Sequence, residues 1–190
     1  MKKLSLFLLA TPLRLILAVF VQNKLLISQS QDLKQNLVEH FFPLLVQLLK
    51  KINLSFAEIE EVFAGNGPGS YTSERVVAVF LRTLKVMRPT IKIFTISNLF
   101  LLSGKQPKTI SLIEANKKEY FFAGFDYEKL CIAPNKILKK DLSFLQKKYP
   151  NFRFVTEQNK FKIASHFENL RIFFRLKTDY RKILPIKEIR

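Results

Sequence analysis

The sequence predicts a mixed α/β fold, and the order of its apolar segments carries that prediction. Three short strand patterns come first, at about residues 3–9, 13–21 and 24–29. A longer segment follows at about 32–52, in which apolar residues recur three and four positions apart, as they do in a helix. Strand and helix patterns then continue to alternate, which is typical of mixed sheets with flanking helices.

The apolar N-terminus allows a second interpretation, because two lysines precede a run that is similar to a secretion signal or a membrane anchor. Arg14 lies near the centre of this run, where a charge costs roughly 2.5–3.5 kcal/mol in a membrane. No small-residue cleavage site follows it. We therefore interpret residues 4–9 and 13–21 as two buried strands of a cytoplasmic protein with no membrane contact.

The predicted helix at 32–52 is apolar on two sides, and such a helix is normally buried on both. One side fits the sheet, and the other needs a second element of the chain or another protein. Pro43 removes one helix hydrogen bond and predicts a kink. The two apolar faces carry Leu37, Phe41, Leu44, Leu45, Leu48 and Ile52, and Val38, Phe42, Val46 and Leu49.

Residues 64–72 read AGNGPGSYT and hold three of the five glycines, Gly65, Gly67 and Gly69, with Pro68 between the last two. The run lies between a strand pattern at 61–64 and a helix pattern at 72–88. A glycine turn at a helix N-terminus leaves backbone N–H groups that can bind an anion or a partner's backbone. The alternative is a tight turn without a ligand, since neither the Rossmann nor the Walker spacing is present. Candidate helix caps are Ser70, Thr72 and Ser73.

The remaining elements divide the chain at Gly104, which is expected to end a short helix at 97–103. Residues 1–104 would form an N-terminal lobe and residues 105–190 a second, basic lobe. The first includes a capping box from Ser55 to Glu58, a strand at 91–96 and a partial basic stripe on helix 72–88. The second includes a hairpin at 109–115 and 119–126, a helix at 141–148 and a strand near 152–156. The basic stripe consists of Arg75, Arg82, Lys85 and Arg88.

The net charge of +17 is concentrated in the C-terminal third. Residues 136–190 hold 15 Lys/Arg against 5 Asp/Glu, and the first 135 residues hold 17 against 10. Such a field attracts polyanions such as RNA. A composition bias or a requirement for solubility would produce the same excess, so both interpretations stay open.

Catalytic and metal-binding patterns are weak. The single cysteine, Cys131, fits a reducing compartment, and the two histidines, His40 and His166, have no metal-ligand spacing. Ser70 is not in a nucleophile-elbow motif, and Tyr71 is expected to plug the space behind the glycine turn. We expect no catalytic residue, metal or cofactor in this chain.

The motif GPGSYT, with a strand before it and a helix after it, resembles the GPGSFTG motif of the TsaB family, non-catalytic subunits of the bacterial tRNA threonylcarbamoyladenosine machinery. Residues 39–49 (EHFFPLLVQLL) and 54–61 (LSFAEIEE) are similar to the family's first helix and the segment before the motif. Residues 109–127 resemble its later hairpin, where a D-A-R-x-x-E-V-Y core becomes Glu114, Ala115, Asn116, Glu119, Tyr120 and Phe121. The resemblance covers about residues 1–127.

This resemblance implies an actin-like, sugar-kinase-like fold and a scaffold role. The chain would bind and order the catalytic TsaD subunit, or pair with a second copy of itself, with the TsaE ATPase joining and tRNA bound through the complex. The structural loop would consist of Gly65, Gly67, Pro68, Gly69, Ser70 and Thr72. The partner interface would consist of Phe41, Phe42, Leu45, Leu49, Val76, Val79 and Phe80.

Two departures from the family bear on function. The family's D-T-S at the end of the first strand is Phe7, Leu8 and Leu9 here, and a phenylalanine cannot orient a phosphate. The G-L-R after the motif is Ser73-Glu74-Arg75, which places an acid beside any anion site. Both favour architecture over nucleotide chemistry. The alternatives are a basic tRNA-binding module without an obligate partner, and a glycoprotease-like or acyl-transferring enzyme.

Overall fold

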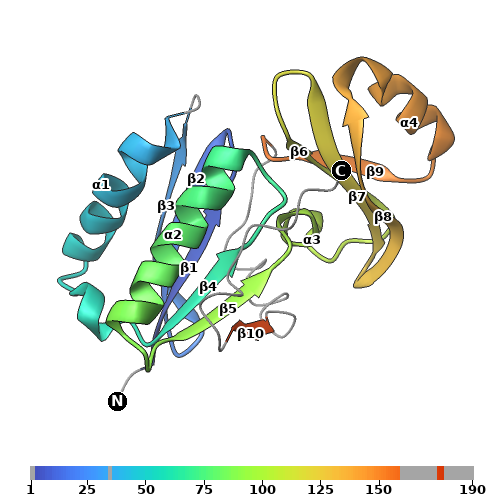
Figure 1. Ribbon diagram of the computed structural model, residues 1–190. Coiled ribbons are helices and arrows are strands. Elements are labelled where there is room, and N and C mark those ends of the chain that lie inside the picture. The colour runs from blue at the N-terminus through green and yellow to red at the C-terminus, as the bar shows by residue number, and fades with distance from the viewer. Residues whose placement is uncertain (1–2, 34–35, 159–174, 178–190) are drawn as a thin grey trace.

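The computed structural model describes residues 3–33, 36–158 and 175–177 and contains two sheets (Figure 1). The first sheet has the strand order β10-β5-β4-β1-β2-β3. Strands β1, β2 and β3 form an antiparallel meander, and β4 and β5 lie parallel to β1 on its other side. These strands are β1 (Leu4–Ala10), β2 (Arg14–Val21), β3 (Lys24–Asp32), β4 (Glu61–Gly65), β5 (Lys92–Ile96) and β10 (Arg175–Lys177).

The second sheet has the order β8-β7-β6-β9, and its strands are β6 (Thr109–Glu114), β7 (Glu119–Asp126), β8 (Lys129–Leu138) and β9 (Arg153–Thr156). The predicted hairpin is confirmed as β6 and β7. The sequence analysis did not predict β8, which contains Pro134. A proline is tolerated there because β8 is an edge strand and need not donate a hydrogen bond outward.

In the described residues, four α-helices and two short 3₁₀ turns connect the strands. Helices α1 (Leu37–Lys50) and α2 (Tyr71–Met87) lie together on one face of the first sheet (Figure 1). Helix α3 (Asn98–Ser103) ends at Gly104, whose φ of 63° is left-handed as predicted, and α4 (Leu142–Lys148) packs on the second sheet. Pro43 lies inside one continuous α1. The 3₁₀ turns are η1 (Phe56–Glu58), which has the predicted capping box, and η2 (Lys139–Asp141).

Alternation along β1 explains how the layers stack. Leu6, Leu8 and Ala10 belong to a core cluster with α1 and α2, whereas Phe7 and Leu9 belong to a second cluster with α3 and the second sheet. A strand buried on both faces needs apolar residues at every position. This requirement explains the signal-like N-terminal run, and the strand interpretation of it is confirmed.

The two sheets share that second cluster, which includes Phe63 from β4 and Phe125 from β7. Strand β10 lies beyond residue 104 and pairs with β5 of the first sheet, so the chain returns to the N-terminal sheet. Division into lobes at residue 104 stays a prediction. Within the described part of the chain, no helix is long and apolar enough to cross a membrane.

Candidate functional site

The glycine turn joins β4 to α2 and is closed by hydrogen bonds within the chain. The N–H of Gly69 donates to Glu74 Oε1 at 2.8 Å. Asn98 holds the loop from the other side, donating its backbone N–H to the Gly67 carbonyl at 2.7 Å and its Nδ2 to the Pro68 carbonyl at 3.2 Å. A group that an anion would use is therefore paired with an acid of the same helix.

Glycine is required in this loop for two reasons. Gly67 has a φ of +97°, a conformation that residues with a Cβ rarely adopt. A Cβ on Gly65 would lie 1.9 Å from Asn98 Oδ1. The cavity left between the loop and α2 has a volume of about 10 Å³, which holds at most one water molecule.

Glu74 is partly desolvated where it closes the loop. Burial raises the pKa of the Glu74 carboxyl above its ordinary value, and the Gly69 N–H opposes this shift. Ser70 is the N-cap of α2 and accepts the Ser73 N–H at 3.2 Å, which confirms one of the three predicted caps. Its Oγ also lies 3.0 Å from Ser73 Oγ, so the hydroxyl has a structural role.

An apolar groove of about 410 Å³ lies on the outer side of α1 and α2. Phe42 from α1 and Val79 from α2 are 56% and 60% exposed along it. Tyr71 is 68% exposed, so the prediction that it plugs the loop is wrong, and Arg75 covers its ring at 4.7 Å. The groove is lined by Val38, Phe42, Tyr71, Thr72, Arg75, Val76, Val79 and Phe80.

The structure corrects the predicted interface, because four of its seven residues are buried in the chain's own core. These are Phe41, Leu45, Leu49 and Phe80, which belong to the core cluster between the helices and the first sheet. Their helical spacing could not distinguish an inner from an outer face, since both faces of α1 are apolar. Phe42 and Val79 stay exposed, and Val76 is half-buried. The sequence analysis left Tyr71, Arg75 and Val38 out of the interface, although Val38 precedes Phe42 by one helical turn.

Aromatic rings support the floor of the groove. The Phe80 ring lies 5.1 Å from Phe41 and 5.9 Å from Phe56, in edge-on arrangements. Phe42 adds a third edge-on contact to Phe80, with a centroid distance of 6.2 Å. The exposed Phe42 ring is therefore held against a packed layer, and its position does not depend on a partner.

The predicted basic stripe of α2 is partly used within the chain. Lys85 Nζ donates to the carbonyls of Pro89 and Ile91, each at 2.7 Å, and Arg88 donates to the Phe56 carbonyl at 2.9 Å. These side chains bind two carbonyl groups that come just after α2 and one carbonyl group in the neighbouring turn η1. Two members of the stripe therefore have structural roles.

A cleft of about 360 Å³ lies between the start of α2 and the hairpin of the second sheet. Ser70 to Ser73 line one side, and residues 114–117 line the other. Nearby, Glu157 Oε1 accepts the Glu114 N–H at 3.0 Å, and burial raises the pKa of the Glu157 carboxyl. The described residues contain no group of three or more His, Cys, Asp or Glu placed to hold a metal ion. His40 contacts the side chain of Gln31 at 3.0 Å, and His166 lies outside the described residues.

Comparison with known proteins places this architecture in a family. Residues 27–150, more than half of the chain, match the family described as "TsaD: tRNA N6-adenosine threonylcarbamoyltransferase". The chain belongs to this family. The predicted TsaB resemblance is confirmed by a match to the "tRNA threonylcarbamoyladenosine biosynthesis protein TsaB" of Buchnera aphidicola, 27% identical over 114 residues. That match covers 57% of this chain and 51% of the relative, so the chain spans about half of that relative's length.

Two further proteins are similar to this chain, one in sequence and one in fold. An uncharacterized protein of Mycoplasma pneumoniae, the MG208 homolog, is 26% identical over 133 residues, covering 64% of this chain and 68% of that protein. YeaZ from Pseudomonas aeruginosa has a TM-score of 0.71 at 13% identity, covering 97% of this chain and 99% of YeaZ. The likeness to YeaZ is one of fold. The predicted mixed α/β fold, with two sheets and flanking helices, is confirmed and is shared with YeaZ.

Proposed function

We propose that this chain is a non-catalytic scaffold subunit in tRNA threonylcarbamoyladenosine biosynthesis, and that it binds and orders a TsaD catalytic subunit. The observation that carries the proposal is the apolar groove on α1 and α2. Exposed aromatic and β-branched side chains there are held in place without a partner. Contiguous apolar surface of this kind is typical of protein–protein contact sites.

The groove is suited to be the centre of a larger interface. Phe42 and Val79 are already about half buried, so covering the rest gains about 1 kcal/mol for each. Association costs at least about 4 kcal/mol in lost rotational and translational freedom, so these two side chains alone do not hold a complex. Tyr71 and Arg75 flank them, and aromatic and arginine side chains are enriched among the residues that dominate binding energy.

The closed glycine loop supports a structural role for GPGSYT. Gly69 donates to Glu74, and Phe7 occupies the first-strand position where the resemblance implies an aspartate. An enzyme of the glycoprotease or acyl-transfer type has less support, since Ser70 caps α2 with its hydroxyl. In the proposed assembly a TsaE ATPase joins in the cytoplasm, tRNA is bound through the complex, and a homodimer could use the same groove.

The test is a mass measurement on the chain with its cognate TsaD, by size-exclusion chromatography with light scattering. We expect a stable heteromer with the wild-type chain. The double variant Phe42→Asp/Val79→Asp places two charges in the groove and should abolish it, because a buried unpaired carboxylate is strongly disfavoured.

The matched control is Val86→Asp, which adds a charge to the same helix at a position that is 61% exposed and outside the groove. This variant should still form the heteromer. Complex formation that survives the double variant would remove the groove from the account. A wild-type chain that does not associate, with or without nucleotide and TsaE, would refute the scaffold role.

A further inference from the structure

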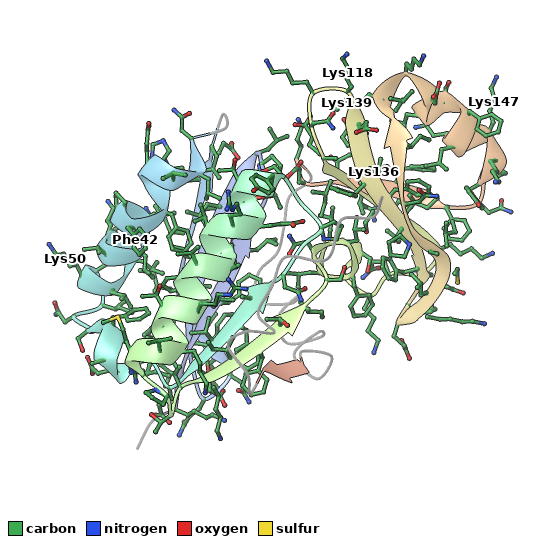
Figure 2. The ribbon with its side chains drawn as sticks, in the orientation of Figure 1. Phe42, Lys50, Lys118, Lys136, Lys139 and Lys147 are labelled. Atoms are coloured by element: carbon green, nitrogen blue, oxygen red, sulfur yellow. The ribbon has the colours of Figure 1, made fainter. Side chains whose placement is uncertain are left out.

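Four exposed lysines lie together at one end of the second sheet. Two come from the turn between β6 and β7, one from the end of β8 and one from η2, which follows β8. Figure 2 shows Lys118 and Lys136 at this end, with Lys139 between them. We call this cluster the lysine edge; it consists of Lys117, Lys118, Lys136 and Lys140.

Backbone hydrogen bonds fix the two segments that carry the lysine edge. Asn116 Oδ1 accepts the N–H groups of Lys118 at 2.8 Å and Glu119 at 3.0 Å, which sets the turn. The Lys139 N–H then donates to the Lys118 carbonyl at 2.8 Å, tying the end of β8 to the turn. The lysines are therefore presented from ordered backbone, which lowers the entropy cost of binding them to a partner.

Two acids and two aromatic rings near the edge make contacts within the chain. Lys139 forms an ion pair with Glu114 and lies 4.8 Å from the centre of the Tyr120 ring. A second nearby acid, Glu119, accepts a hydrogen bond from Asn116 Nδ2 at 2.7 Å, and a third, Asp141, follows Lys140 in η2 and is exposed. Lys136 lies 5.2 Å from the centre of the Phe121 ring. The Lys136 ammonium group thus lies against an aromatic face, and the side chain is exposed to solvent.

The charge of this region is not balanced locally. Residues 115–153 contain nine Lys/Arg and four Asp/Glu. Like charges held close together repel one another. Lys85 and Arg88 on α2 show the contrasting case, in which basic side chains bind carbonyls of their own chain. The lysine edge instead offers compact point charges to an external anion.

We propose that the lysine edge binds the phosphate backbone of RNA. Lys118 immediately precedes β7, and Lys136 of β8 pairs with Phe121, which lies three residues after Lys118. Three residues span about 10 Å in an extended strand, so the edge is long enough to contact more than one phosphate. Lysines interleaved with partly exposed aromatic rings are typical of surfaces that follow a nucleic-acid backbone. The choice of RNA over other polyanions rests on the proposed role in tRNA modification.

The test compares two triple variants of the full chain that remove the same charge. Lys118→Gln/Lys136→Gln/Lys140→Gln alters the edge, and Lys24→Gln/Lys50→Gln/Lys51→Gln alters exposed lysines of the first sheet and its helix. Lys50 lies on the opposite side of the molecule from Lys118 (Figure 2). Binding to an unmodified tRNA transcript is followed by fluorescence anisotropy as salt is raised from 50 to 200 mM.

We expect the edge variant to bind tRNA at least tenfold more weakly and the slope of log K against log salt to fall by about 2–3, which corresponds to three lost phosphate contacts. The control should stay close to the wild type. Equal losses in the two variants, or no loss in the edge variant, would overturn the proposal. Displacement of tRNA by poly-L-glutamate at equal charge concentration would also overturn it, by showing an acidic polypeptide to be an equal ligand.

The outcome separates this inference from the scaffold role. The edge variant should still form the heteromer with TsaD, and Phe42→Asp/Val79→Asp should still bind tRNA through the edge. If the heteromer never forms but tRNA binding depends on the edge, the scaffold role fails and the RNA site stands. If the heteromer forms and tRNA binding does not depend on the edge, the RNA site is refuted and the scaffold role is not.

Discussion

Helix α2 has two sides that differ in how their exposed groups are paired. On the loop side, Glu74 binds the Gly69 N–H and Ser73 packs under Ser70, which leaves a cavity the size of one water molecule. On the outer side, Val79 and Tyr71 stay largely exposed along a groove of about 410 Å³. The chain thus pairs the Gly69 N–H at the glycine turn with its own carboxylate and leaves apolar surface uncovered on the other side.

This difference separates a structural side of α2 from the side that we propose to bind a partner. A motif rich in glycine suggests a ligand site by its composition, yet here the carboxylate of Glu74 accepts the Gly69 N–H. An apolar helix face suggests a core by its composition, yet here the outer part is exposed over a packed aromatic layer. Substitutions on the two sides should therefore change different properties.

The largest contrast is expected between Phe80 and Phe42, whose rings touch across the floor of the groove. Phe80→Ala removes a buried ring and should lower the free energy of unfolding by about 3–5 kcal/mol. Phe42→Ala removes an exposed ring and should lower it by less than about 1 kcal/mol. Urea denaturation of the isolated chain measures both.

The two variants should behave differently toward the partner. Phe42→Ala should weaken the heteromer with TsaD while leaving the chain folded. If Phe42→Ala costs as much stability as Phe80→Ala, the Phe42 ring belongs to the chain's own core. The distinction between the buried Phe80 and the exposed Phe42 would then be lost.

A smaller effect is expected at the loop, where Glu74→Gln should change how stability depends on pH. Burial raises the pKa of Glu74 in the folded protein, so folding favours the protonated form. The stability linked to this shift is fully present below the unfolded pKa and is lost as pH rises through the folded pKa. Glutamine stays neutral, so the free energy of unfolding of Glu74→Gln relative to the wild type should increase from about pH 4 to about pH 7.

Thermal or urea unfolding at several pH values measures this dependence. The exposed Glu39 of α1 provides the control, since Glu39→Gln removes the same charge away from the loop. A constant difference between Glu74→Gln and the wild type across this range would show that Glu74 does not lose solvation where it closes the loop.

Much of the first sheet could be predicted from the sequence, because local patterns decided it. Strand β1 is apolar at almost every position. The Ser55 capping box indicated the start of η1, and Gly104 indicated the end of α3. Strand β8 could not be predicted in this way. It is exposed over most of its length, so it lacks the alternation that burial imposes, and it contains Pro134, a residue that is unfavourable inside a strand.

The candidate site, like the fold, could be predicted from the sequence only in part. The GPGSYT turn and its Ser70 cap could be predicted because glycine and serine have specific backbone roles. Which face of α1 is exposed could not, since Phe41 and Phe42 are adjacent, chemically identical and separated only by helix rotation. Glu74 closes the loop by accepting the N–H of Gly69, five positions earlier in the sequence, and composition does not indicate this contact.

The most direct test of the central claim is hydroxyl-radical footprinting of the chain alone and mixed with its cognate TsaD. Phe42 and Tyr71, which are 56% and 68% exposed in the groove, report on the proposed interface. Tyr127 and Phe144, which are 53% and 66% exposed on the second sheet and its helix, are internal controls. The account predicts that TsaD protects Phe42 and Tyr71 from oxidation and leaves the two controls unchanged. Equal oxidation of Phe42 and Tyr71 with and without TsaD, under conditions where the heteromer forms, would contradict it.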